Sequence, residues 1–178
     1  KGEKEFRNID FELCRFTDCD FSGSMFSNLC FEECIFVNCK LDNVILNNVK
    51  FKNELVFKDS KCIGINWENV SDLLGIRIEA ESTDFSFNIF GDKNISDSKF
   101  NNCIIKDGEF AGTNLKNVEF NLTDLEGSNF NRADLEGADL TSSFNYLFDV
   151  RENNVKNIKV SRETGINLLL QFGIRIND

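Results

Sequence analysis

The sequence predicts an all-β solenoid, a four-sided coil in which each turn takes about twenty residues. A large apolar residue recurs at every fifth position, without a miss from Phe6 to Phe36. This period fits neither an amphipathic helix nor a half-buried strand, which repeat every 3.6 and every two residues. A small or medium residue stands two positions before each of these centres, and the other three positions are mostly polar. Two inward positions in five fit a chain that turns a corner after each short extended segment.

Four such segments close one coil, and successive coils stack at the inter-strand spacing of roughly 4.7–4.9 Å. Residues twenty apart then lie above one another, so Phe11, Phe31 and Phe51 are expected to form one column. Each coil leaves backbone donors and acceptors unsatisfied until a neighbour covers it, so the repeats stabilise one another only as a stack. Burial of each central side chain contributes roughly 1.5–3 kcal/mol.

The repeat falls into two regular registers separated by an irregular segment. The first register runs from Phe6 to Phe51, and the second runs from Phe85 to Val160 with one miss at Asn145. Both belong to one predicted solenoid, residues 1–160. The segment between them, residues 52–84, needs irregular loops near 52–56, 68–72 and 79–84, with centres at Phe57, Cys62, Trp67, Leu73 and Ile78.

After Val160 the period ends, and residues 161–178 are predicted to form a short capping and dimerisation helix with a tail. Ser161 fits an N-cap, Glu163 fits the first turn, and Gly173 fits the residue just past the helix end. Apolar residues occupy more than one face of this helix. One face can cover the last coil, and the other can pair with a second copy in a two-fold dimer. A plain end cap with exposed leucines is the alternative. The expected dimer residues are Ile166, Leu168, Leu169, Leu170, Phe172 and Ile174.

The repeat resembles the pentapeptide-repeat family, whose units read roughly A-(D/N)-L-x-x. The clearest stretch is "TDLEGSNFNRADLEGADL", residues 123–140. The resemblance implies a right-handed quadrilateral β-helix with a short C-terminal α-helix. The tail "FGIRI", residues 172–176, and "LLGIRI", residues 73–78, also resemble elements of the Qnr-type quinolone-resistance subgroup. That resemblance implies a DNA gyrase partner.

Composition excludes several classes of protein. The chain has no His and a formal net charge of −10, with a pI near 4.6. A nucleic-acid binder needs a basic surface to displace counterions, so no nucleic-acid partner is expected. No apolar run is long enough to span a membrane, and no membrane partner is expected. Seven Cys without a signal-like segment favour reduced thiols and a cytoplasmic location.

The sequence predicts no catalytic, metal or cofactor site and no enzyme. Five of the cysteines occupy the small inward position and lack the C-x-x-C pairs or His partners of a metal site. Paired acids can act as general acid and base only where a pocket shifts one of their pKa values. The wall of a filled rod offers no such pocket. These cysteines are Cys14, Cys19, Cys34, Cys39 and Cys103.

The acidic exterior suggests mimicry of DNA. A rod of nearly eight coils would be roughly 37 Å long, and a tail-to-tail homodimer would approach the length of about 22 base pairs. The leading hypothesis is a non-enzymatic rod that binds DNA gyrase or topoisomerase IV and protects it from fluoroquinolone-like poisons. The alternative is a structural or interaction scaffold with an unrelated partner. The expected loop contacts are Glu68, Asn69, Asp72, Glu79, Glu81 and Asp84, and the expected acidic face is Asp124, Glu126, Asp134, Glu136 and Asp139.

Overall fold

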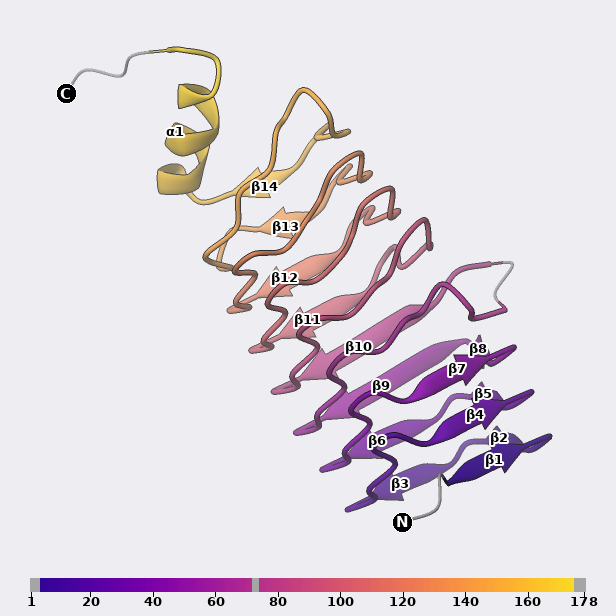
Figure 1. The fold of residues 1–178 in the computed structure, drawn as a ribbon. Helices are drawn as coiled ribbons and strands as arrows, with labels where there is room; N and C mark the ends of the chain where they lie inside the picture. Colours follow the sequence, from indigo (N-terminus) through magenta and orange to yellow (C-terminus); the bar gives the residue numbers. More distant parts are fainter. Residues whose placement is uncertain (1–3, 72–73, 175–178) are drawn as a thin grey trace.

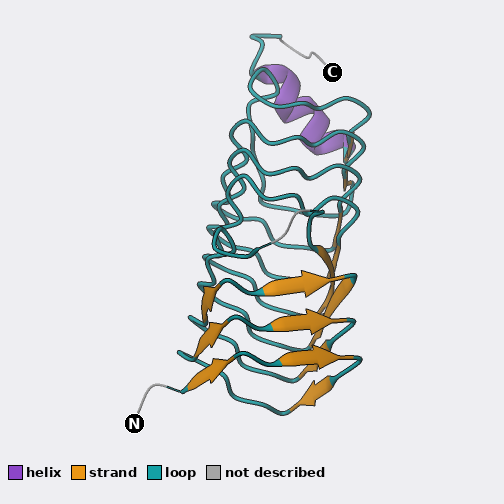
Figure 2. Ribbon diagram, turned by 90° about the vertical axis from the view of Figure 1, so that its right-hand side faces the viewer, coloured by secondary structure: helices purple, strands orange, loops and turns teal. Residues whose placement is uncertain are grey.

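The chain winds into a right-handed, four-sided β-helix that ends in one short helix (Figure 1). The computed structural model describes residues 4–71 and 74–174. The first strand and the helix lie at opposite ends of the rod, and the coils between them stack in chain order (Figures 1 and 2). Every strand pairing is parallel because each coil repeats the direction of the one before it.

Three of the four faces carry named strands. The first face contains β1 (Glu5–Arg7), β4 (Met25–Ser27) and β7 (Ile45–Asn47). The second face contains β2 (Asp10–Glu12), β5 (Cys30–Glu32) and β8 (Lys50–Lys52). The third face is an eight-stranded sheet made of β3 (Arg15–Thr17), β6 (Ile35–Val37), β9 (Glu54–Lys58), β10 (Arg77–Glu81), β11 (Lys99–Asn101), β12 (Glu119–Asn121), β13 (Asp139–Leu140) and β14 (Lys159–Val160).

The fourth face is held by single parallel bridges between successive coils. They follow one column of residues that stand just before the inward centres. Similar bridges continue the first face from Asn66 to Asn129 and the second face from Asn94 to Asn154. The column on the fourth face runs through Asp20, Lys40, Lys61, Asp84, Ile104, Asp124 and Phe144.

The core is a set of columns of stacked side chains, as the period of five predicts. Phe11, Phe31 and Phe51 lie above one another, with ring centroids 5.2 and 5.5 Å apart. Phe90 and Phe110 form a second stack, with centroids 5.1 Å apart. Parallel in-register coils place identical side chains at the strand spacing, so flat rings stack with little loss of packing. The inward assignment of the centres is therefore confirmed.

The irregular middle differs from its predicted threading. Phe57 pairs with Ala80, and Ala80 pairs with Phe100, so Ala80 rather than Ile78 continues the central column. Ile78 lies opposite Leu55 and is also fully buried. The predicted loop near 79–84 is wrong, because strand β10 ends at Glu81 and the regular spacing continues beyond it.

The extra residues lie instead between Val70 and Ile76, next to the undescribed pair 72–73. Val70 still bridges Val49, and Ile76 again donates to a backbone carbonyl of the coil above. The one-residue slip near 52–56 is real: β9 pairs Phe57 with Phe36, 21 positions apart, and becomes a five-residue strand. The predicted centre Leu73 lies outside the described residues.

Helix α1 (Arg162–Leu170) closes the C-terminal end of the rod, as predicted. The Ser161 side chain accepts a hydrogen bond from the Thr164 backbone N–H, which satisfies an otherwise free donor of the first turn. Gly173 takes the left-handed conformation, with φ of +71°, and the chain leaves the helix there. Figure 2 shows the helix lying across the last coils.

Candidate interaction surface

The predicted loop contacts do not form one loop. Glu79 and Glu81 lie on β10 in the third face, and Asp84 lies on the fourth face. Glu68 and Asn69 form a tight turn between the first and second faces. The remaining residue of this predicted set, Asp72, lies outside the described residues. The structure therefore spreads these side chains over several sides of the rod.

The five acids expected to form one acidic face lie on three faces. Asp124 and Glu126 lie on the fourth face, Asp134 and Glu136 on the second, and Asp139 on the third. Each step of five residues turns the chain by one face, so acids ten residues apart lie on opposite sides of the coil. The expectation of a single acidic face is wrong for this geometric reason.

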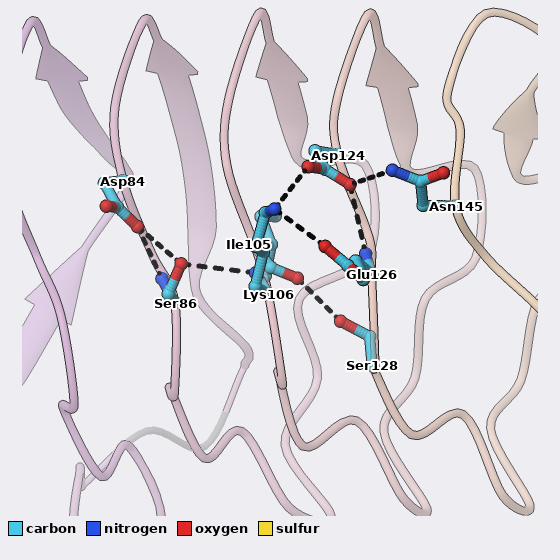
Figure 3. A network of polar contacts seen from close by, with 8 residues as sticks. All are labelled: Asp84, Ser86, Ile105, Lys106, Asp124, Glu126, Ser128 and Asn145. Atoms are coloured by element: carbon cyan, nitrogen blue, oxygen red, sulfur yellow. Dashed lines mark hydrogen bonds and ion pairs between the residues drawn. The ribbon is translucent and has the colours of Figure 1, made fainter.

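On the fourth face, one lysine neutralises two of these acids (Figure 3). The Lys106 Nζ lies 3.1 Å from Asp124 Oδ2 and 2.7 Å from Glu126 Oε2. The Asn145 side chain, from the next coil, donates to Asp124 Oδ1 at 2.9 Å. Three successive coils are thus joined through a single carboxylate.

The same ladder continues toward the N-terminus. Ser86 donates to Asp84 Oδ1 from its backbone N–H at 2.9 Å and from its hydroxyl at 2.6 Å. The backbone N–H of Lys106 donates to the Ser86 hydroxyl oxygen at 3.3 Å (Figure 3). On the inner side of the corner, the Ser128 hydroxyl donates to the Ile105 carbonyl at 2.7 Å. The polar wall of this face therefore connects the coils to one another.

The second face repeats the arrangement. Lys116 Nζ lies 3.3 Å from an Asp134 oxygen and 3.1 Å from a Glu136 oxygen. Lys156, one coil further on, approaches the other Glu136 oxygen at 2.9 Å. On the third face, Lys159 pairs with Asp139 at 3.1 Å. All five predicted acids are therefore ion-paired to lysines of adjacent coils.

These pairings keep the acids ionised. Hydrogen bonds from Lys156 and then Lys116 lower the pKa of Glu136. Partial burial raises the pKa of Asp124, but hydrogen bonds from Asn145 and Lys106 outweigh it, so the net shift is downward. Hydrogen bonds to Glu126 and Asp124 raise the pKa of Lys106. Lowered pKa values of the acids and raised pKa values of the lysines favour fixed ion pairs over proton transfer.

Carboxylates that sequence reasoning missed stand at the corners. Asp59, Asp97 and Asp107 are exposed and take left-handed backbone conformations, with φ of +49°, +58° and +51°. Among the described residues, none of these three forms an ion pair. The sequence did carry the signal, because each stands two positions after an inward centre. They supply unneutralised charge on the rod.

The C-terminal helix and the residues just after it present apolar side chains to solvent. Leu169, Leu170, Phe172 and Ile174 are 44 to 52% exposed. Leu168 is only 7% exposed and joins the core of its own chain, so it caps the stack and is not available to a second copy. Ile166 is half-buried. The other four predicted dimer residues remain accessible.

Five of the seven cysteines are buried thiols, and Cys14 and Cys19 are half-buried. Burial raises the pKa of Cys34, Cys39 and Cys62, and it raises that of Cys103 to about 11. Thiols with raised pKa values are poor nucleophiles and poor metal ligands at neutral pH. Within residues 4–71 and 74–174, no group of His, Cys, Asp and Glu is arranged to hold a metal ion.

The result of a comparison with known protein families agrees with this geometry. The pentapeptide-repeat family model matches eight copies, over residues 5–36, 14–53 and 109–142. The matched segments lie at both ends of one continuous stack of coils, and the unmatched middle follows the same winding. This is a pentapeptide-repeat protein.

A solved structure of another pentapeptide-repeat protein, HetL, shares the fold, and a second match is QnrB1. HetL from the cyanobacterium Nostoc sp. strain PCC 7120, involved in heterocyst differentiation regulation, is 14% identical over 90% of each chain, with a TM-score of 0.56. Trypsin-treated QnrB1, a plasmid-mediated fluoroquinolone resistance protein, is 16% identical, covering 99% of this chain and 100% of its own, with a TM-score of 0.45. Comparison with curated protein sequences gives no match.

Pentapeptide-repeat proteins are generally structural or interaction proteins rather than enzymes. In this one, several outward side chains form ladders between coils, and the apolar centres fill the rod. In the part of the chain that is described, no helix is both long and apolar enough to cross a membrane. Because the interior is filled, a partner can bind only on the outside of the rod, at its walls, its corners or its two ends.

Proposed function

We propose that the protein is a non-enzymatic dimeric rod that binds a type II topoisomerase, DNA gyrase or topoisomerase IV, in place of DNA. The observation that carries the proposal is a narrow, straight rod with a formal net charge of −10. The eight strands of the third face give each protomer a length of about 34 Å at the inter-strand spacing. Two protomers joined at their C-terminal ends span about 20 base pairs.

The corners supply the charge in this proposal. The five wall acids predicted from the sequence are paired with lysines, whereas Asp59, Asp97 and Asp107 are exposed and form no ion pair among the described residues. Lysines and arginines that normally hold phosphates would meet these corner carboxylates. Such contacts mainly steer and speed association, so binding should weaken as salt rises.

The partner is proposed from the sequence resemblance. The tail "FGIRI", residues 172–176, resembles that of the Qnr-type subgroup, and the expected consequence is relief from fluoroquinolone-like poisons. A gyrase partner would place the protein in the cytoplasm. The dimer axis would then align with the two-fold axis of the enzyme.

The dimer can be tested by replacing one exposed residue of the helix and one just after it. We expect Leu169→Asp with Phe172→Asp to give a folded rod of half the wild-type mass by light scattering, because a buried charge has no partner across the interface. Leu168→Ala is the contrast, since Leu168 lies in the core and its loss should lower thermal stability without changing the mass. A wild type that is already monomeric rules out the dimer.

The partner can be tested by gyrase supercoiling with and without ciprofloxacin. We expect micromolar protein to restore supercoiling in the presence of the drug, or to inhibit supercoiling in its absence. The triple variant Asp59→Asn, Asp97→Asn and Asp107→Asn should weaken either effect, whereas Glu136→Gln, on a lysine-paired wall, should leave it unchanged. If the wild-type protein neither restores supercoiling with the drug nor inhibits it without the drug, the topoisomerase partner is rejected.

A scaffold for an unrelated protein is the second candidate. The observation that favours it is that the five wall acids predicted from the sequence are all paired with lysines, which removes part of the charge that a DNA mimic would use. This candidate predicts an intact dimer that has no effect on supercoiling. The supercoiling assay and the light-scattering measurement together separate the two functions.

A further inference from the structure

A shallow groove runs along the corner between the third and fourth faces. It crosses successive coils from Asp59 to Phe144 and has a volume of about 660 Å³. At the coil spacing, four steps make it about 19 Å long. Its side-chain lining divides into an apolar end and an acidic end. The lining residues used below are Asp59, Lys61, Asp84, Ile104, Leu122, Asp124 and Phe144.

The apolar end is made by three exposed side chains on adjacent coils. Ile104 is 43% exposed, Leu122 is 62% exposed and Phe144 is 47% exposed. Ile104 bridges Asp124, and Asp124 bridges Phe144, so the two apolar residues flank one carboxylate in the same column. Clustering of three large apolar side chains on a polar wall marks an interaction site more strongly than scattered exposure does.

Leu122 is the residue that the fold alone does not explain. It stands at a left-handed corner, with φ of +49°, and the same corner in other coils carries Asp18, Asn38 and Asn102 at φ of +50° to +55°. Asn and Asp tolerate this conformation, whereas leucine is disfavoured there and also leaves its side chain in water. Leu122 therefore lowers the stability of the fold through both its backbone conformation and its exposed side chain. We expect such a residue where a partner covers it.

The other end of the groove is acidic. Asp59 is exposed and forms no ion pair among the described residues, and Asp84 is half-buried and accepts hydrogen bonds from Ser86. Asp124 lies within the apolar end, between Ile104 and Phe144, and is paired with Lys106. Asp59 and Asp84 against the single Lys61 leave this end of the lining negative. The complementary ligand therefore carries positive charge at one end and apolar groups at the other.

We propose that this groove binds a short amphipathic helix of a partner protein, with apolar residues against Ile104, Leu122 and Phe144 and basic residues toward Asp59. The helical pitch of about 5.4 Å is close to the coil spacing, so successive turns can follow successive coils. A helix of about 13 residues fills the length of the groove. The backbone groups of the wall are already bonded between coils, so recognition is by side chains rather than by strand addition.

The test uses the full chain with isotope-labelled Ile and Leu methyl groups and a synthetic helical peptide of about 14 residues. The peptide carries leucines one and two turns apart in its first half and lysines in its last turn. We expect methyl shifts at Ile104 and Leu122 on titration, with binding in the micromolar range. A peptide with glutamates in place of the lysines, and one with asparagines in place of the leucines, should each bind about tenfold more weakly or worse.

Leu122→Asn is the decisive variant, because it restores the residue type that this corner carries elsewhere. We expect unchanged or higher thermal stability together with a loss of about tenfold in peptide affinity. Leu13→Asn is the matched control: Leu13 is also an exposed leucine at positive φ, 70% exposed with φ of +53°, but it lies outside the groove. This control should keep wild-type affinity.

Three results would overturn the proposal. They are shifts confined to the C-terminal helix, equal affinity for the lysine and glutamate peptides, and equal effects of Leu122→Asn and Leu13→Asn. A lower mass for Leu122→Asn by light scattering would also reject it, because a second copy would then occupy the groove. The outcome does not depend on a topoisomerase partner, so the supercoiling assay can fail while the groove is confirmed.

Discussion

At the scale of the residue, the corners rather than the centres set the fine requirements of this fold. Most corners place a residue in the left-handed conformation, and Asn or Asp is the most frequent choice there. Where an Asp side chain folds over the next coil, glycine takes the corner above it. A Cβ at Gly127, for example, would lie 2.3 Å from an Asp107 carboxylate oxygen. The choice at one corner thus depends on the corner twenty residues earlier.

Two phenylalanines should respond in opposite ways to truncation. Phe110 is fully buried between stacked rings, and Phe110→Ala should cost about 3–5 kcal/mol through lost contacts and a cavity. Phe87 is 57% exposed at a corner with φ of +61°, so Phe87→Asn should leave stability unchanged or raise it. Urea unfolding followed by circular dichroism measures both. Equal losses would contradict the separation of inward and corner positions.

At the scale of the element, each coil is joined to its neighbours by ladders of opposite charge. Opposite charges on adjacent coils pair across the coil spacing, as Lys99 with Glu119 and Lys159 with Asp139 do, although Glu119 and Asp139 are themselves neighbours in this column. Exposed pairs of this kind are individually weak. Their main effect is to favour one register of coils over another.

The pairing of Glu136 predicts a pH dependence. Its pKa is lowered in the folded state, so the pair stabilises the fold above the unfolded pKa of about 4.3 and loses this effect as pH falls through the folded pKa. Glu136→Gln should therefore be less stable than the wild type at pH 7 and equally stable near pH 2. Chemical unfolding at both pH values checks this. A stability difference that does not change with pH would assign it to packing.

At the scale of the whole molecule, the rod behaves as a stack whose length is set by the number of coils. Each coil contacts only its neighbours, so the stack can be shortened without changing the design. Phe100, Phe120 and the fully buried Leu140 occupy equivalent positions in three successive coils. If one coil is deleted, the next coil therefore presents an equivalent inward side chain at the same place in the stack.

Deletion of residues 103–122 should give a folded rod that is shorter by about 4.8 Å, because it joins Asn102 to Thr123 in the correct register. Small-angle scattering measures the length, and circular dichroism measures the fold. Deletion of residues 103–120 is the control: removing 18 residues turns polar positions inward, and the variant should unfold at a much lower temperature. Similar stability of the two deletions would contradict the five-residue frame.

The sequence by itself determined the inward side chains, the coil and the capping helix, because the period of five depends only on local chain geometry. It could not determine which outward residues meet, because that depends on how many residues each coil contains. The number of residues between Val70 and Ile76, a segment that includes the undescribed pair 72–73, sets where Ala80 falls. Only the tertiary structure decided that Asp124 and Asp134 point to opposite sides, that lysines neutralise them, and that Ile104, Leu122 and Phe144 line one groove.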